Sequence, residues 1–547
     1  MTEPRPTLPA LLRDLVARFG PRPLCVLGEQ RITYAEADAL SARLARGLLA
    51  QGVAKGARVA VLFPNGPDFI VAWLAAARIG AVVVPLNTFY KPRELGYVLR
   101  HADVHTLLTT PRLLGNDYLE RLEVVAPSLA RERESGGALF LGELPHLRAI
   151  FVFGDPGARA WAKKREDIET DGRAVGLDDA FLAAVEAEVA PADPAVLVYS
   201  SGSMADPKGA LHSHGTLVRH SANLNQFRDL RADDRIFSPM PFFWVGGLVF
   251  SLLSTLQTGA LLICEEFFEP GATLALLERE RATIAAGWPH YSKAMAEHPS
   301  FASRDLSSIR SGNLYTLLPA SARPKDPELR SNSLGMTETC GPHTIDRMDV
   351  DLPEKLRGSF GHAVPGVEHK IVDPKTGATL PPGESGEICV RGYSLMLGLH
   401  KQERDETFDR DGFYHTGDVG RFDAEGHLFF EARLGDLIKT AGANVAPREV
   451  EVLLEAMPEV SSAYVVGLAD GVRGQKVAAA LVLTPGAHLD TETVRERLKK
   501  DLSSYKLPRH VFCVAKEELP FTDSGKIDKR KLAPLLEARV RADTRAR

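Results

Sequence analysis

The chain has 547 residues, of which 44% are hydrophobic and 25% are charged, and its net charge is −5 at pH 7. A chain of this length is too long to fold around a single hydrophobic core, so its length predicts a large composite domain followed by at least one more domain. Because 66 basic residues stand against 71 acidic ones, the composition offers no basic face and excludes nucleic acid as an expected partner.

The termini and the apolar stretches indicate where the chain resides. Residues 1–16 lack a basic segment followed by an apolar run, so no signal peptide is expected. Polar residues interrupt the longest apolar stretches, 69–86 and 246–264, and each predicts a buried helix followed by a buried strand rather than a transmembrane segment. Five widely spaced cysteines argue against a disulfide framework or a zinc knuckle. We therefore expect a cytoplasmic protein.

The predicted elements change in character along the chain. Residues 31–110 alternate amphipathic helices with apolar strands, which predicts a parallel sheet with helical crossovers. Surface helices or insertions are predicted for 111–190, and a strand that enters a Gly-Gly turn for 235–248. Short alternating strands after 360 predict a β-rich subdomain, and the segment from Gly435 predicts a separate α+β domain. The predicted domains are 1–434 and 435–547.

A loop rich in small and hydroxylated residues follows the apolar strand that ends at Tyr199. Serines, glycines and Lys208 are crowded between positions 200 and 209, so backbone N–H groups and one ammonium could surround a phosphate. Five residues separate Gly202 from Lys208, which differs from the four of the ordinary P-loop. Alone, such a loop is more often a linker, and only the later stretches favour a phosphate site.

Five stretches follow one another in a fixed order: YSSGSMADPKG (199–209), LGMTE (334–338), YHTGD (414–418), ARLGDLIKTAGANVAPREVE (432–451) and LPFTDSGKIDKRKL (519–532). Together they resemble the adenylate-forming superfamily, and in particular its acyl-CoA synthetases, over essentially the whole chain. The resemblance implies an α/β fold with a large N-terminal AMP-binding domain of stacked βαβ sheets, a β-rich subdomain, and a small mobile α+β domain at the C-terminus.

The resemblance also implies a reaction: an ATP-dependent, AMP-forming carboxylic acid:CoA ligase. A carboxylate attacks the α-phosphate of ATP, pyrophosphate leaves, and the acyl group passes to CoA. ATP, Mg²⁺ and CoA are thus the expected small molecules. Two anions must meet, so the site needs cations and hydrogen-bond donors aimed at the developing charge.

Each matched position takes a role from the resemblance. Thr337 is expected to contact phosphate and Glu338 to bind Mg²⁺, while Asp418 and Arg433 hold the ribose. Lys526 is expected to bridge the attacking carboxylate and the phosphate, so Lys526, Thr337 and Glu338 are the predicted catalytic residues. The predicted ATP and AMP contacts are Ser200, Ser201, Gly202, Ser203, Lys208, Ser333, Leu334, Gly335, Met336, Thr337, Asp418 and Arg433.

Several positions depart from the family pattern. Met204 replaces a hydroxyl donor in the phosphate loop, and Ala205 replaces a glycine. Leu334 stands where an aromatic residue often stacks on adenine. Gly435 occupies the pivot between the domains, which is commonly Asp or Lys, and glycine still permits rotation there. Trp244 replaces a histidine, and its interpretations as pocket wall and as ordinary core are equally favoured.

The substrate contacts are predicted less directly. The expected acyl pocket is apolar and compatible with fatty, alicyclic or aryl acids, and it comprises Trp244, Val245, Gly246, Gly247, Tyr315, Gly335 and Cys340. The expected CoA contacts are Lys439, Gly442 and Asn444. The oligomeric state stays open, with a homodimer allowed.

Two alternatives remain. The chain could load a separate carrier protein, which predicts adenylation without a thioester to free CoA. It could instead be a degenerate relative that binds nucleotide or acyl-adenylate without turnover. The substitutions Met204, Ala205 and Leu334 motivate the second alternative, whereas the presence of Lys526, Glu338 and Asp418 argues against it.

Overall fold

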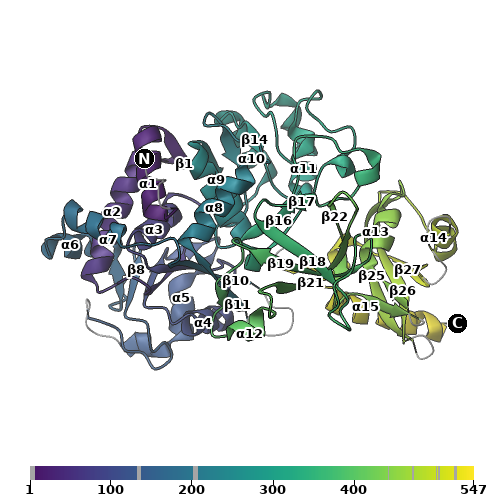
Figure 1. Cartoon of the computed structure of the whole chain (residues 1–547). Coiled ribbons are helices and arrows are strands. Elements are labelled where there is room, and N and C mark those ends of the chain that lie inside the picture. The colour runs from purple at the N-terminus through teal and green to yellow at the C-terminus, as the bar shows by residue number, and fades with distance from the viewer. Residues whose placement is uncertain are drawn as a thin grey trace. The chain divides into compact units, whose positions relative to one another are not determined.

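The structure, a computed structural model, describes residues 6–131, 137–200, 207–440, 443–470, 474–499, 502, 506–522 and 526–546. It divides the chain into two compact units (Figure 1). The first unit comprises Met1–Glu368 and Val390–Tyr414, and the second comprises His369–Cys389 and His415–Arg547. The predicted boundary at residue 435 lies inside the second unit and stays a prediction.

An eight-stranded sheet forms the centre of the first unit. In sheet order its strands are β20 (Gly398–Leu399), β11 (Lys208–Ser213), β10 (Pro194–Ser200), β4 (Val82–Pro85), β3 (Arg58–Leu62), β5 (Thr106–Thr109), β8 (Ala149–Val152) and β9 (Ala162–Lys164). The pairings from β10 to β9 are parallel, and β11 pairs antiparallel with β10 and β20. The predicted parallel sheet is therefore confirmed.

Helices cover both faces of this sheet (Figure 1). Val59 and Val61 of β3 pack with α2 (Tyr34–Ala50) and α3 (Pro67–Arg78), while the intervening Ala60 and Leu62 pack with α4 (Pro92–His101) and α5 (Tyr118–Val125). Alternate residues of a strand point to opposite faces, so a strand segment buried on both faces is apolar throughout, as β3 is from Val59 to Leu62.

A second sheet and several further helices complete the first unit's α/β core. The sheet contains, in order, β14 (Ile284–Ala285), β12 (Arg235–Phe237), β13 (Leu261–Cys264), β1 (Pro23–Leu27) and β2 (Gln30–Thr33). The further helices are α1 (Leu8–Phe19), α6 (Arg165–Ala174), α7 (Asp179–Ala187), α8 (His214–Asn225), α9 (Ser254–Thr258), α10 (Pro270–Arg279), α11 (Pro289–Ala296) and α12 (Arg404–Thr407). Smaller sheets are β6 (Arg112–Leu113) with β7 (Asn116–Asp117), and β15 (Ser333–Met336) with β16 (Gly341–Ile345) and β17 (His362–Ala363).

The apolar stretch 246–264 forms a helix followed by a strand, as predicted: a π-helix over Gly246–Leu253, then α9, then β13. The predicted Gly-Gly turn is wrong, because Gly246 and Gly247 open the π-helix. A Cβ on Gly247 would lie 1.9 Å from the Pro241 carbonyl oxygen. The two glycines therefore permit close packing against the preceding turn rather than a change of direction.

The second unit contains two sheets. Most of the sheet β18 (Val367–Val372), β19 (Gly386–Gly392), β21 (Tyr414–Phe422) and β22 (Leu428–Arg433) belongs to it. The other sheet comprises β24 (Ala443–Val445), β23 (Ile438–Thr440), β26 (Gly474–Leu483), β25 (Val460–Asp470) and β27 (His510–Cys513). The helices α13 (Pro447–Glu455) and α14 (Thr491–Leu498) contribute to one core cluster, and α15 (Lys529–Ala546) contributes to another. The predicted α+β character of this region is confirmed.

Among the described residues, no helix combines the length and the apolar character that crossing a membrane would require.

Buried histidines make the stability of the first unit dependent on pH. His214 lies at the start of α8, and its Nδ1 accepts a hydrogen bond from the backbone N–H of Leu8 at 3.3 Å. Burial lowers the pKa of His214 to about 4, and burial does the same for His212 and His220. All three are therefore neutral in the folded protein at neutral pH.

We expect acidification to destabilise the protein through these histidines. The unfolded chain takes up their protons near pH 6.5, whereas the folded chain resists until about pH 4. The stabilisation that comes from burying these histidines in their neutral form is thus complete above pH 6.5 and is lost as the pH falls towards 4. For His214→Gln we expect the free energy of unfolding to lose about a third of this pH dependence, measured by urea denaturation between pH 4.5 and 7.5. The exposed His488 provides the control variant His488→Gln; an unchanged pH dependence in His214→Gln would contradict the expectation.

Candidate functional site

The predicted phosphate loop connects two antiparallel strands of the first unit. Ser200 ends β10 and pairs with Lys208, which begins β11. The Lys208 side chain is exposed at the end of this hairpin, so its ammonium is available to an anion. Ser201, Gly202 and Ser203, together with Met204 and Ala205, lie outside the described residues.

The predicted magnesium ligand lies in a tight turn between two strands. Ser333, Leu334, Gly335 and Met336 form β15, and Thr337, Glu338 and Thr339 form a 3₁₀ turn before β16. Glu338 is buried, with a relative exposure of only 9%. A Cβ on Gly335 would lie 2.4 Å from the backbone of Gly341, so glycine is required where the two strands approach.

His212 of β11 connects the strand that follows the predicted phosphate loop to the turn that carries Glu338. Its Nε2 lies 2.7 Å from the carbonyl oxygen of Thr337. Burial lowers the pKa of His212 to about 4, so the neutral ring must donate its Nε2–H to that carbonyl. Sequence reasoning missed His212, because a histidine in an apolar strand carries no signal of the distant residue that it contacts.

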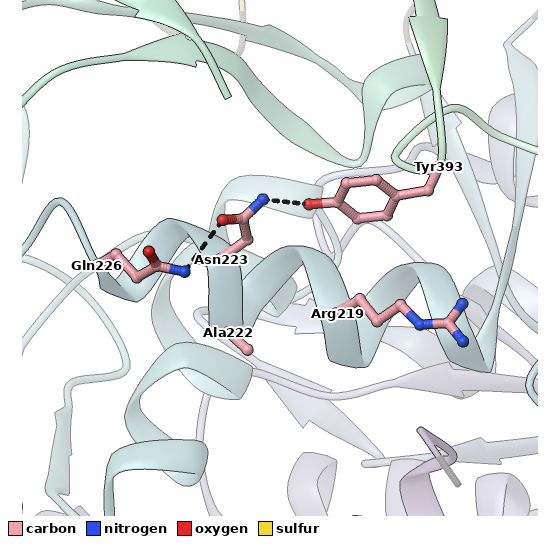
Figure 2. Close-up of a pocket in the computed structure, with 5 residues that line it drawn as sticks. All are labelled: Arg219, Ala222, Asn223, Gln226 and Tyr393. Carbon is pink, nitrogen blue, oxygen red and sulfur yellow. Dashed lines mark hydrogen bonds between the residues drawn. The ribbon is translucent and has the colours of Figure 1, made fainter. Parts of the chain in front are cut away.

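A second connection reaches the same turn from α8. The Thr216 hydroxyl donates to the Tyr393 carbonyl at 3.0 Å, and the Asn223 amide donates to the Tyr393 hydroxyl at 2.6 Å. Three residues further on, the Met396 backbone N–H donates to the carbonyl of Glu338 at 2.9 Å. Figure 2 shows Asn223 between Tyr393 and Gln226. These three residues, together with Arg219 and Ala222, line a pocket of about 350 Å³. This network holds the segment that supports the Glu338 turn.

Three of the predicted acyl-pocket residues contribute to two different core clusters. Val245 and Cys340 belong to the large cluster with α2 and α3, whereas Tyr315 packs against the cluster around Phe237. Cys340 is fully buried, and burial raises the pKa of its thiol. Trp244 is half-buried in the turn that precedes the π-helix, not in a strand.

Aromatic side chains from two segments meet beside Trp244. The Phe243 ring contacts the Trp244 ring at 5.2 Å between centroids and the Phe89 ring at 6.1 Å, both edge to face. Phe89 is 45% exposed. The row Phe89–Phe243–Trp244 therefore extends from solvent to the start of the π-helix, a geometry in which an aromatic ligand could take the next edge-to-face position.

The two predicted ribose contacts lie side by side in the second unit. Asp418 and Arg433 face each other in the β21–β22 register. The Arg433 Nε lies 2.6 Å from Asp418 Oδ1, and the Asp418 side chain is 4% exposed against 53% for Arg433. The Asp418 backbone N–H donates to the Thr416 hydroxyl at 3.0 Å. The carboxylate is thus oriented by its own strand and by the neighbouring guanidinium.

The remaining predicted residues belong to the second unit. Gly435 occupies an exposed turn in which an added Cβ would contact nothing within 4 Å. Lys439 pairs with Asn444 in the β23–β24 hairpin, and Gly442 lies outside the described residues. Lys526 is exposed, and its backbone is held by three hydrogen bonds with Thr522, of which the shortest is 2.7 Å. These bonds fix the backbone from which the exposed side chain extends.

The donor set around Glu338 fits a magnesium ion. Mg²⁺ prefers oxygen ligands and is usually held by one or two carboxylates together with substrate phosphates. Glu338 supplies a carboxylate and Thr337 a hydroxyl on the same short turn. Lys208 would complement such an ion by balancing further phosphate charge.

Comparison with known proteins gives consistent matches over the whole chain. Residues 12–400 match the AMP-binding enzyme family, and residues 449–526 match the AMP-binding enzyme C-terminal domain. Feruloyl-CoA synthase of Amycolatopsis sp. is 35% identical over 93% of this chain and 95% of its own length. Indoleacetate–CoA ligase of Aromatoleum aromaticum is 31% identical over 92% of each. The ATP-bound structure of MatB from Rhodopseudomonas palustris superposes with a TM-score of 0.77 at 27% identity, covering 96% of this chain and 98% of that chain.

Replacing His212 tests its connection to the Glu338 turn. In His212→Leu the Thr337 carbonyl loses its donor in a buried place, at a cost of about 1–3 kcal/mol. We expect the rate of ATP-dependent adenylation to fall about tenfold, with a raised KM for ATP and an unchanged KM for the acid. His212→Asn retains a side-chain N–H and should recover part of the loss. A fall in melting temperature with unchanged kinetics would mean that His212 is merely structural.

Replacing Asp418 tests the ribose contact. The unaltered enzyme should prefer ATP to 2′,3′-dideoxy-ATP, since each hydrogen bond to a charged carboxylate contributes about 1.5–3 kcal/mol. We expect the Asp418→Asn variant to bind ATP more weakly and to lose most of the preference for ATP over 2′,3′-dideoxy-ATP, as measured by KM for the two nucleotides. Asp436→Asn, in the turn after β22, is the matched control and should retain it. Equal discrimination in Asp418→Asn and the control would exclude the contact.

Proposed function

Because the chain belongs to the AMP-binding enzyme family and is an AMP-forming carboxylic acid:CoA ligase that uses ATP, Mg²⁺ and CoA, we propose that its acid substrate is an aryl acid. The observation that carries this proposal is the aromatic row Phe89–Phe243–Trp244, which leads from solvent to the segment 244–247. An aromatic ring of the substrate placed next in this row would add a further edge-to-face contact. Such contacts contribute about 0.5–1.5 kcal/mol each beyond burial. The names of the relatives that act on aryl acids support the same substrate class.

The first half-reaction needs charge stabilisation at several points. Lys208 and the serines of the loop would bind the leaving phosphates, and Asp418 with Arg433 would hold the ribose. Glu338 would hold Mg²⁺, which would supply positive charge to balance the phosphates. Lys526 would stabilise the developing charge between the acid and the α-phosphate, since a compact ammonium can follow charge from one oxygen to another.

The second half-reaction requires a thiol where pyrophosphate has left. In the proposed division, 1–434 binds acid and nucleotide, and 435–547 carries Lys526 for adenylation and Lys439 to Asn444 for CoA. One segment would present two different surfaces in turn, so Gly435 serves as the pivot of a rotation between the steps. The surroundings of Gly435 support this role, because a Cβ added there would meet no atom of the described residues within 4 Å.

We further propose that the protein is cytoplasmic. All five cysteines carry free thiols, which supports a reducing compartment.

Light scattering after size-exclusion chromatography tests the homodimer that the sequence allows.

The deciding experiment measures pyrophosphate release with ATP and Mg²⁺ across fatty, alicyclic and aryl acids, with and without CoA. Mass spectrometry then identifies the product. We expect an aryl-CoA thioester, with fatty and alicyclic acids at least about tenfold slower. Lys526→Ala should reduce adenylation about 10²–10³-fold, whereas Lys531→Ala, which removes an exposed lysine on α15, should not.

Each other outcome has a distinct meaning. Turnover of fatty acids alone would overturn the aryl proposal while leaving the ligase activity in place. Pyrophosphate release without thioester would indicate a carrier-protein thiol as acceptor. Nucleotide binding without any release would indicate the degenerate relative.

A further inference from the structure

A group of three potential metal ligands lies on two neighbouring strands of the second unit, outside the residues discussed for ATP and CoA. Glu387 and Cys389 are two positions apart on β19, and His415 is on β21, the next strand in the sheet. One ligating atom from each residue lies within 4.8 Å of the other two. We propose that Glu387, Cys389 and His415 form a binding site for Zn²⁺.

The distances between the ligand atoms match the size of the ion. The Cys389 Sγ lies 3.5 Å from His415 Nδ1. Zinc bonds of about 2.3 Å to sulfur and about 2.0–2.1 Å to nitrogen at the tetrahedral angle place those two atoms about 3.5 Å apart. The Glu387 Oε2 lies 2.8 Å from the same nitrogen, a hydrogen-bond distance that must widen by about 0.5 Å when the ion enters.

The glutamate is oriented for this role by its other oxygen. Glu387 Oε1 accepts the backbone N–H of Gly417 at 3.0 Å, which leaves Oε2 directed at His415. A hydrogen bond to the second oxygen of a ligating carboxylate is a recurrent feature of protein metal sites. The Thr416 hydroxyl also donates to the Ile388 carbonyl at 2.7 Å, so the two strands that carry the ligands are held in register beside the site.

Burial and access are both satisfied. Cys389 is fully buried and Glu387 is 8% exposed, whereas the His415 side chain is 42% exposed. The ion would approach past the histidine, and water would complete a tetrahedral set with three protein ligands.

The ligand chemistry selects the metal and balances the protons. A thiolate with an imidazole favours Zn²⁺ or Co²⁺ over Mg²⁺, which prefers oxygen ligands only. On binding, the Cys389 thiol releases its proton to solvent, and the imidazole carries its proton on Nε2 so that Nδ1 can coordinate. The site is thus chemically distinct from the proposed magnesium ligand Glu338, and the inference does not depend on the proposed function.

A neighbouring acidic group serves as a comparison. Asp423, Glu425 and His427 also lie within reach of one another, but the Asp423 carboxylate already accepts the His427 backbone N–H at 2.8 Å and contacts its ring within a single turn. That arrangement is explained by the turn alone. His427→Gln is therefore a matched control for histidine removal.

The test is a Co²⁺ titration of the full-length protein in the absence of Mg²⁺, followed by absorption spectroscopy. We expect one equivalent of Co²⁺ to produce a thiolate-to-cobalt charge-transfer band, and Zn²⁺ to abolish it by displacement. Cys389→Ser should lose the band and bind Zn²⁺ at least about tenfold more weakly. Cys513→Ser removes the exposed cysteine and should behave like the unaltered protein, as should His427→Gln.

Two results would overturn the proposal. One is the absence of a charge-transfer band in the unaltered protein at saturating Co²⁺. The other is a band that persists in Cys389→Ser and disappears in Cys513→Ser, which would mean adventitious binding at the exposed thiol. If Cys389→Ser fails to fold, as judged by its melting curve, His415→Gln provides the same test, because it alters a partly exposed side chain.

Discussion

The antiparallel pairing of β10 with β11 is the constraint on which the candidate site of the first unit depends. It reverses the chain between Ser200 and Lys208, beside the run of parallel strands from β10 to β9. Parallel strands need long crossovers, whereas a hairpin can place a short polar loop at the end of a buried strand. The same pairing directs His212 of β11 at the Thr337 carbonyl, so the strand that follows the predicted phosphate loop also supports the turn that carries Glu338.

Burial decides how the polar groups of this half behave. His212, His214 and His220 are buried, and burial lowers the pKa of each ring to about 4. Neutral rings can serve as directional donors and acceptors in the interior of the unit without burying a charge there. In the second unit, by contrast, the buried Asp418 carboxylate is compensated by Arg433 at 2.6 Å, which keeps an acceptor available on a strand.

Comparing sequence with structure shows where local patterns were sufficient. The alternation of helix and strand in residues 31–110 predicted the parallel sheet, because a strand segment buried on both faces is apolar throughout. The stretch 246–264 predicted a helix and a strand for the same reason. The Gly-Gly turn was predicted wrongly, since two glycines may either reverse a chain or admit close packing, and only the contact of Gly247 with Pro241 distinguishes the two.

The sequence by itself determined the fold class, the family and the order of the predicted site residues, because those depend on periodicity and on contiguous motifs. Only the tertiary structure decided which distant residues support them. His212 with Thr337, Tyr393 with α8, and Cys389 with His415 are each joined across many positions of the chain. No local pattern encodes such contacts, because they arise when strands and helices that are separate in sequence are placed side by side in a sheet or against its edge.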